Sequence, residues 1–233
     1  WGAWLPLIFS YLPSLGFTTT QQAWILNAFP LSAIVGMFFS NQFADRHFAA
    51  EKFLGLSHLI GGLAILGLGF TREFWPFFVL MLVHCLFYVP TISIANSIAF
   101  THMKDAQKEF GFVRMGGTIG WILAAWPFTF ILVDWARVKA AAPQGVIAWL
   151  GTALGSGLTG QALRQATRWT FIVAGVVSLG LAAYSLALPH TPPKKKKPEA
   201  SAAERFAWLE AVKLLKHPFV LILWFLTFVD AFV

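Results

Sequence analysis

Charge-free stretches alternate with short charged links along most of the chain. Residues 1–44, 53–71, 74–103, 115–133 and 169–193 contain no Asp, Glu, Lys or Arg. A helix that crosses the hydrocarbon of a bilayer needs about 20 predominantly apolar residues. Buried helices of soluble proteins can also be apolar all round, but they rarely run this long in succession. The pattern therefore predicts an all-α integral membrane protein.

The stretches predict six spanning helices and the start of a seventh. The first stretch supplies two of them, because Pro13, Gly16 and the polar run 18–22 interrupt it. The expected helices cover residues 1–16, 20–43, 53–71, 74–100, 112–134 and 168–188, and the seventh begins near Pro218 and stops with the chain at Val233. Thr20 is expected to cap the second helix, and Pro90 to kink the fourth. Without an initial Met or a basic leader region, the start is expected to be truncated.

Residues 134–168 are predicted to form a long loop on the outer side. The segment 140–163 is uncharged, but Pro143, Gln144 and five glycines make it a poor solute for hydrocarbon. The links after the second, fourth and sixth helices then share one side. That side holds Arg46, Lys52, Lys104, Lys108, Lys194, Lys195, Lys196, Lys197, Arg205, Lys213 and Lys216, whereas the other holds Arg72, Arg137, Lys139, Arg164 and Arg168. Because basic residues favour the cytoplasmic side, the lysine cluster is expected inside.

Residues 189–217 are predicted to form a basic cytoplasmic linker between the bundle, residues 1–188, and the seventh helix, 218–233. Its two prolines and four lysines cannot build a packed element. Ser201 and Glu204 then have capping-box spacing, and the apolar residues that follow indicate an amphipathic helix at the membrane surface. A lysine cluster can also bind nucleic acid or anionic lipid. We favour a determinant of topology and expect no nucleic-acid partner.

Composition excludes several other classes of protein. Only 12% of the residues are charged, against about 25% in soluble domains, and the mean hydropathy is +0.68. The single cysteine, Cys85, cannot form an internal disulfide, and zinc-ligand spacing is absent. Paired carboxylates and Ser/His/Asp arrangements at the membrane edges are also lacking. We therefore expect no catalytic residues, no metal and no cofactor, and favour a transporter over a membrane-embedded enzyme or a non-transporting scaffold.

The fifth predicted helix has one polar-aromatic face. At about 100° per residue, Arg114, Thr118 and Trp121 fall within about 60° of one another. Gly116 and Gly120 lie on the opposite side, a small-xxx-small pattern suited to close helix packing. The polar face suits a flat solute that accepts hydrogen bonds and stacks on an indole. Alternatively, Arg114 extends to the cytoplasmic interface and Trp121 packs against a neighbour.

The order of six helices, a basic linker and further helices resembles the major facilitator superfamily, whose two six-helix halves are joined by a cytoplasmic loop. The link after the second helix, NQFADRHFAAEKFL at 41–54, resembles the superfamily's G-x-x-x-D-R/K-x-G-R/K-R/K loop. Asp45 and Arg46 match its centre, whereas Asn41 and Phe48 replace its two glycines. This carboxylate and guanidinium can latch a helix end that opens during transport. An ordinary charged turn is the alternative.

The segments FVRMGGTIGW at 112–121, FYVPTISIANSIAF at 87–100 and LPHTPP at 188–193 resemble the nucleoside:proton symporter family of that superfamily. The resemblance implies proton-coupled nucleoside uptake by alternating access in the inner membrane of bacteria, with a nucleoside, a proton and the lipid bilayer as partners and no obligate protein partner. It also implies that Arg114, Thr118 and Trp121 bind the nucleoside. Asn96, a polar residue of the fourth helix, is a further substrate-binding candidate.

Ionisable groups within spanning helices are candidates for proton coupling. Asp230 in the seventh helix and His84 in the fourth are such groups, although a single histidine is more often a packed, hydrogen-bonded residue. The acidic residues to which the resemblance assigns this role belong to the second half of the family's proteins. Sugars or other small polar metabolites are the alternative substrates.

Overall fold

The computed structural model describes residues 1–36, 48–193 and 214–230, with side chains as far as 226. The described helices are α1 (Leu5–Ser14), α2 (Thr19–Leu26), α3 (Ala28–Val35), α5 (Ala50–Leu68), α6 (Phe74–His102), α7 (Ala106–Ile131), α8 (Trp135–Ala141), α9 (Val146–Gly155), α10 (Gly160–Tyr184, continued by a 3₁₀ turn Ser185–Ala187) and α13 (Pro218–Asp230). Within these residues the only pairing of β type is an isolated bridge between Val133 and Gly157. The all-α prediction is confirmed.

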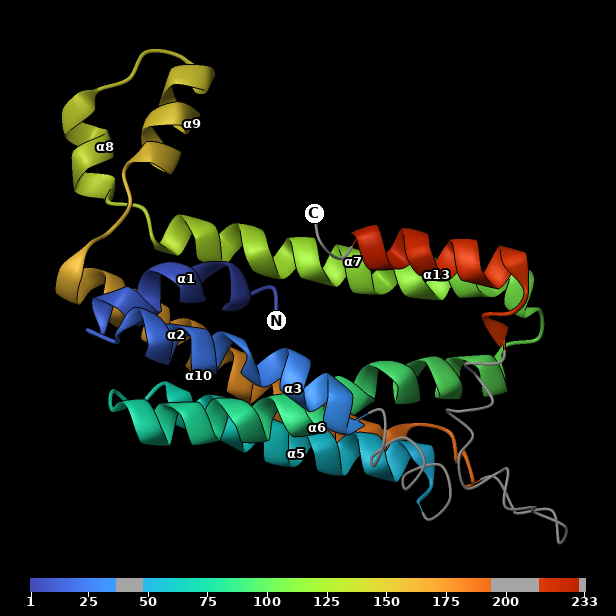
Figure 1. Ribbon diagram of the computed structural model, residues 1–233. Helices are drawn as coiled ribbons and strands as arrows, with labels where there is room; N and C mark the ends of the chain where they lie inside the picture. Colours follow the sequence, from blue (N-terminus) through green and yellow to red (C-terminus); the bar gives the residue numbers. More distant parts are fainter. Residues whose placement is uncertain (37–47, 194–213, 231–233) are drawn as a thin grey trace, which may run out of the picture. The chain divides into compact units, whose positions relative to one another are not determined.

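The chain divides into two compact units, residues 1–193 and 194–233. The second unit contributes a single described helix, α13, whose 13 residues are almost all apolar. All other described helices belong to the first unit (Figure 1). We call the end of the first unit that holds residues 48–52, 102–106 and 185–193 its inner end, after the predicted topology, and the opposite end its outer end.

Three of the described helices are long and apolar enough to cross a membrane: Ala50–Leu68, Phe74–His102 and Gly160–Ala187. Helix α7 has 26 residues, but Lys108, Glu109 and Arg114 lie in its first three turns. Helices α1, α2 and α3 have ten residues or fewer. The count of six spanning helices and the start of a seventh therefore stays a prediction.

The second predicted helix, 20–43, differs most from the structure. It begins one residue earlier, because Thr18 and not Thr20 is the N-cap. The Thr18 hydroxyl accepts from the Gln21 amide at 3.3 Å, and the Gln21 carboxamide oxygen accepts from the Thr18 amide at 2.9 Å. This reciprocal capping box satisfies the backbone amides of Thr18 and Gln21. Thr20 could not form such a box, because the residue three positions later is Ala23, which has no polar side chain. The helix is then interrupted at Asn27, whose side chain donates to the Ala23 carbonyl at 2.8 Å.

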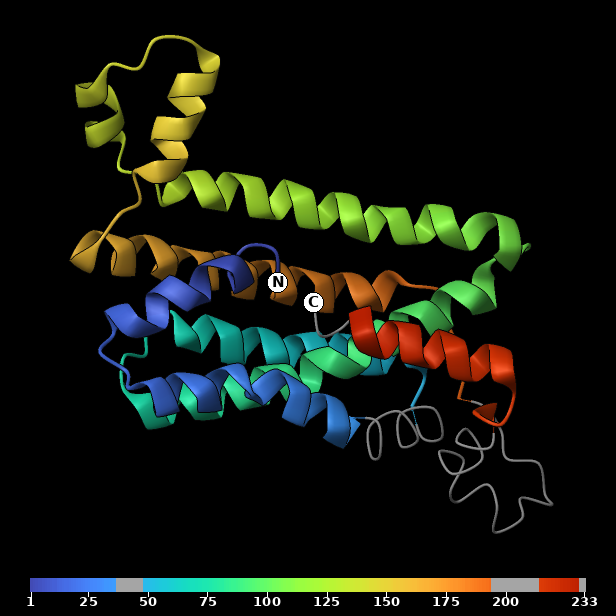
Figure 2. The same cartoon turned by 45° about the horizontal axis from the view of Figure 1, so that its top comes forward.

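The predicted loop 134–168 contains two short helices and the first turns of α10. Asp134 caps α8 by accepting from the Arg137 amide at 3.1 Å. Helix α9 has ten residues, too short to cross a bilayer, for which about 20 are needed. Together α8 and α9 stand off from the bundle at the outer end of α7, as both views show (Figure 2).

Helices α5 and α10 run antiparallel in direct contact, and glycines permit this approach. A Cβ atom at Gly175 would lie 2.7 Å from the Leu66 Cβ and 2.9 Å from its backbone nitrogen. On the facing helix, a Cβ at Gly62 would lie 3.0 Å from the Ser178 side chain. The Ser178 hydroxyl donates to the His58 carbonyl at 3.1 Å, so a hydrogen bond also joins the two helices. Small residues with one polar contact are typical of helix pairs in membranes.

An aromatic core fills the space beside this pair. Phe77 of α6 and Phe171 of α10 are completely buried, with their ring centroids 6.1 Å apart. Trp4 and Tyr11 cover Phe171 with centroids at 5.9 and 5.5 Å. Helix α1 is therefore held to α6 and α10 by ring contacts. Such contacts contribute about 0.5–1.5 kcal/mol each beyond area burial.

At the inner end, Glu51 and His102 form hydrogen bonds with residues 190–191, which follow α10. Glu51 is buried, and its two oxygens bind His190 Nδ1 and the Thr191 amide, both at 2.9 Å. The Thr191 carbonyl accepts from the Ala50 amide at 2.9 Å. Its hydroxyl lies 2.9 Å from His102 Nε2. One threonine thus joins the start of α5, the end of α6 and the exit from α10.

Substituting Gly175 tests the contact between α5 and α10. Ala at this position is expected to destabilise the protein by about 1–3 kcal/mol, because its methyl group collides with the backbone of α5. Gly180→Ala is the matched control: it lies on the same helix with no described atom within 4 Å of the added methyl group. It should stabilise by about 0.5–1 kcal/mol through helix propensity. Thermal melting of the purified protein distinguishes the two, and equal effects would contradict the packing described.

Candidate functional site

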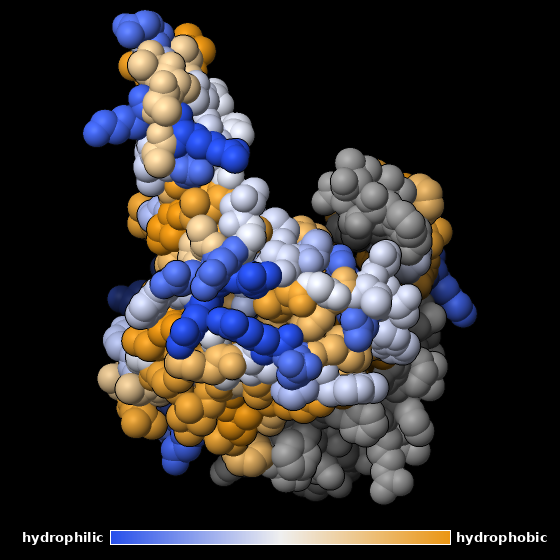
Figure 3. Space-filling model, turned by 90° about the vertical axis from the view of Figure 1, so that its left-hand side faces the viewer, coloured by the Kyte–Doolittle hydropathy of each residue, from blue (hydrophilic) through white to orange (hydrophobic). Residues whose placement is uncertain are grey.

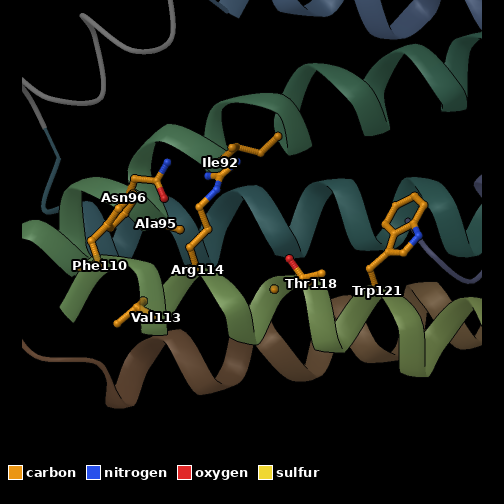
Figure 4. A pocket seen from close by; sticks show the side chains of 10 residues that line it. Ile92, Ala95, Asn96, Phe110, Val113, Arg114, Thr118 and Trp121 are labelled. Carbon is orange, nitrogen blue, oxygen red and sulfur yellow. The ribbon is translucent and has the colours of Figure 1, made fainter. Parts of the chain in front are cut away.

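A cavity of about 580 Å³ lies between α6 and α7, in the range of small-molecule sites. Its walls are mainly apolar, with a few polar groups that converge on it (Figure 4). Ile92, Ala95, Asn96 and Ala99 line it from α6, and Phe110, Val113, Arg114, Gly117, Thr118 and Trp121 line it from α7.

All four residues predicted to bind substrate line this cavity. Arg114, Thr118 and Trp121 stand on the same side of α7, in agreement with the helical spacing, and Asn96 faces them from α6 (Figure 4). The Arg114 side chain extends across the cavity toward Ile92, not toward the inner end. Trp121 is 41% exposed, and its role in binding stays a prediction.

The polar groups of the cavity are free to bind a solute. Among the described residues, the side chains of Asn96, Arg114, Thr118 and Trp121 form no hydrogen bond or ion pair with one another or with a neighbour. A guanidinium offers five donors, a hydroxyl and a carboxamide can both donate and accept, and an indole offers a ring face and one donor. This set suits a neutral, flat solute with carbonyl and hydroxyl groups. A single uncompensated cation also suits a partial negative charge.

Sequence reasoning missed the inner boundary of the cavity. Phe110 lines it and stacks on Phe100 of α6, with ring centroids 4.4 Å apart and planes inclined by 21°. This ring pair closes the gap between α6 and α7 next to the cavity. Phe110 comes four residues before Arg114, so helical periodicity places it on the same face and was the available signal.

The glycine face of α7 does not show the predicted close packing. A Cβ atom at Gly116 or Gly120 would meet no described atom within 4 Å. The close approach occurs elsewhere, at Gly2, where a Cβ would lie 2.9 Å from the Trp121 carbonyl oxygen and 3.2 Å from the Ala124 Cβ. The segment before α1 thus supports the backbone that carries Trp121.

His84 lies in a second cavity, of about 280 Å³, which Trp4, His58 and Tyr88 also line. Its Nδ1 is 2.9 Å from the Gly61 carbonyl, and its ring stacks on Tyr88 with centroids 5.4 Å apart. The structure therefore does not bring His84 together with Arg114. Its ring is buried, and its Nε2 has no hydrogen-bond partner among the described residues.

Several predicted features lie outside the described residues. They are Asp45 and Arg46 of the loop after the second predicted helix, and the amphipathic helix of the linker. Asp230 is the last residue of α13 and lies beyond the residues whose side chains are described.

Comparisons with known proteins agree on one family. The family model described as nucleoside H+ symporter matches residues 1–159 and 143–233. A putative nucleoside transporter of Escherichia coli, YegT, is 28% identical over 99% of this chain and 48% of its own length. A xanthosine permease of the same organism is 26% identical over 94% of this chain and 46% of its own.

A solved structure has the same fold. The crystal structure of the nucleoside transporter NupG superposes with a TM-score of 0.65 at 20% identity, covering 96% of this chain and 48% of that one. The chain thus spans about half the length of the relatives it matches.

Cysteine labelling tests whether the cavity holds water. Cys85, the single cysteine of this chain, is buried and should not react with a charged thiol reagent. Thr118→Cys places a thiol in the cavity and is expected to react, because thiolate formation needs a polar environment. Val176→Cys, on the exposed apolar surface of α10, is the control that should stay unlabelled in the membrane. Equal labelling of the two variants would show that α7 does not border an aqueous cavity.

Proposed function

Because the chain belongs to the nucleoside H+ symporter family, we propose that it forms one half of a transporter that couples nucleoside uptake to proton influx by alternating access. The cavity between α6 and α7 is the observation that carries the proposal. In proteins of this kind, the substrate site lies near the midplane at the interface of two repeats. The cavity here is lined by two helices of one half, which is the share of such a site that one repeat contributes.

We assign each lining group a role toward the nucleoside. Trp121 stacks on the base, because its indole is exposed to the cavity and flat rings stack with favourable geometry. Arg114 donates to base carbonyls, and Thr118 and Asn96 bond to ribose hydroxyls. The apolar side chains of Ile92, Ala95 and Val113 exclude water around these contacts when the nucleoside is bound. Each polar contact then becomes selective, because an analogue that lacks its partner leaves a buried group unpaired.

The proposed location is the bacterial cytoplasmic membrane, with several passes through it. Three helices able to cross a membrane support this, as does the unequal distribution of basic residues on the two sides. The inner end then faces the cytoplasm.

The relatives suggest which substrates to test first. One of them is named a xanthosine permease, which points to purine nucleosides, and another is named a nucleoside transporter without a stated base, so pyrimidine nucleosides join them in the first panel. A sugar or another small polar metabolite is the second candidate, because Arg114, Thr118 and an aromatic face also suit a hydroxylated ring. Uptake of labelled uridine, adenosine and ribose separates them: saturable uptake of ribose with none of either nucleoside would favour the second candidate.

Substituting Arg114 tests the site directly. Arg114→Ala in the full-length protein is expected to weaken nucleoside binding about 10- to 100-fold, since a hydrogen bond from a charged donor contributes about 1.5–3 kcal/mol. Trp121→Phe should keep most of the affinity and Trp121→Leu should lose it, because only the former preserves stacking. Binding is measured by calorimetry and uptake in reconstituted vesicles.

Arg137→Ala is the control, since this exposed arginine of α8 lies outside the cavity and pairs only with Asp134 among the residues described. Unchanged affinity in Arg114→Ala would remove the guanidinium from the site. A lost signal in both arginine variants would indicate misfolding instead.

We further propose that Asp230 is the proton carrier, that His84 is structural, and that Asp45 with Arg46 forms the gating latch. The packed environment of His84 motivates the second assignment. Asp230→Asn mimics a permanently protonated carboxylate, so it should bind nucleoside yet fail to accumulate it against a gradient. His84→Gln should retain accumulation, and Asp45→Asn should slow uptake at unchanged affinity. Proton-gradient-driven accumulation by Asp230→Asn would refute the first assignment.

A further inference from the structure

A third cavity, distinct from the one around His84 and also of about 280 Å³, opens at the outer end of the first unit. It is lined by Arg72, Gln161, Arg164, Gln165 and Arg168. Arg72 comes from the link between α5 and α6, and the other four belong to the first turns of α10. Hydrophilic residues gather in the middle of this end and are bordered by hydrophobic ones (Figure 3).

The three arginines have no acidic partner among the described residues. The salt bridges found there involve Glu51, Asp105 and Asp134, none of which lines this cavity. Glu73 follows Arg72 in sequence but does not pair with it. Like charges around one small cavity repel each other, and partial removal from water strengthens that repulsion. An anion bound in the cavity would relieve this repulsion.

Two of the arginines are held in place by other contacts. Arg164 Nη1 donates to the Ser14 carbonyl at 2.7 Å, and the Arg168 guanidinium lies 4.8 Å above the Phe70 ring centroid. The Nε atom of Arg168 is buried and has no hydrogen-bond partner in the part of the chain that the structure describes. Arg164 and Arg168 are therefore held beside the cavity, and Arg168 retains one N–H donor that is unpaired among the described residues.

The depth of the cavity in the bilayer indicates where its anion comes from. Phe70, Trp75 and Trp169 are exposed on the same ends of α5, α6 and α10. Aromatic residues concentrate at the level of the lipid headgroups, where the phosphates of phospholipids also lie. Basic residues are depleted on the outer side, yet three of the five predicted there converge on this cavity.

We propose that Arg72, Arg164 and Arg168 bind the phosphate of an anionic phospholipid in the outer leaflet. Guanidinium groups match phosphate oxygens with paired hydrogen bonds. Gln161 and Gln165 can bond to the glycerol hydroxyls of a phosphatidylglycerol headgroup. The bound phosphate would neutralise the positive charge of the three arginines. It would do so where Arg164 contacts the end of α1 and Arg168 contacts Phe70 after α5.

The test measures lipid binding and not transport, so it is independent of the proposed function. Full-length protein in detergent is melted with added dioleoylphosphatidylglycerol or dioleoylphosphatidylcholine, and retained lipids are counted by native mass spectrometry. Wild type should be stabilised more by the anionic lipid. Arg72→Gln should weaken that binding about fivefold, as expected from the loss of one basic residue near a lipid surface. The triple variant with Arg164→Gln and Arg168→Gln should lose the preference.

Controls make every outcome decisive. Arg137→Gln removes an outer arginine away from the cavity and should bind as wild type does. The exposed Arg72 side chain forms no hydrogen bond or ion pair among the described residues, so its variant should keep the fold even if the triple variant does not. Equal binding of the anionic lipid by wild type and Arg72→Gln would overturn the proposal. So would full reproduction of the lipid's effect by inorganic phosphate, which would indicate a site for a free anion.

Discussion

The close approach of α5 and α10 is the constraint on which the rest of the first unit depends. In a bilayer, burying apolar surface between helices brings little gain, because lipid tails are as apolar as the side chains. Association therefore relies on backbones coming near enough for dense van der Waals contact, which Gly62 and Gly175 allow. Helix α6 packs against α5, and the rings of Phe77 and Phe171 then fix α1. A methyl group at Gly175 would collide with Leu66 and push α5 and α10 apart.

Helix α7 follows a different rule. It makes few contacts with the rest of the first unit and has no buried residue among those described. Two of its contacts lie on either side of the cavity: Phe110 stacks on Phe100 near the inner end, and the segment at Gly2 rests on the backbone of Trp121. Between them the helix stands away from α6, which leaves room for the cavity. Polar side chains are tolerated there because they face a hollow and not a packed neighbour.

Much of this was predictable from the sequence, and the exceptions have physical causes. Charge-free stretches indicated the all-α class, and the segments at 87–100, 112–121 and 188–193 indicated the family; both predictions are confirmed. The 100° spacing of Arg114, Thr118 and Trp121 indicated one shared face. Spacing cannot pair residues across helices, so it missed Phe100 against Phe110. The binding roles of the cavity residues stay predictions.

The positions that the sequence could not reveal depend on distant partners. Glu51 reads as part of a solvated link, but its partners His190 and Thr191 are about 140 residues away, and their contact buries it. Thr20 has a residue type that commonly caps helices, but the structure shows that Gln21 accepts a hydrogen bond from the Thr18 amide, so the cap is Thr18. The helices α8 and α9 were read as a loop, because their glycines and polar residues outweighed a weak apolar pattern.

The grip on Thr191 has a mechanical consequence. If residues 188–193 were connected to α10 alone, a force along the chain would act on α10 alone and could unwind its last turn. Here the fastening reaches the beginning of α5 and the end of α6 as well, through Ala50, Glu51 and His102. A force that arrives along the chain beyond Pro193 is therefore shared by three helices. The chain therefore leaves the first unit at a point that is hydrogen bonded to α5 and α6 as well as continuous with α10.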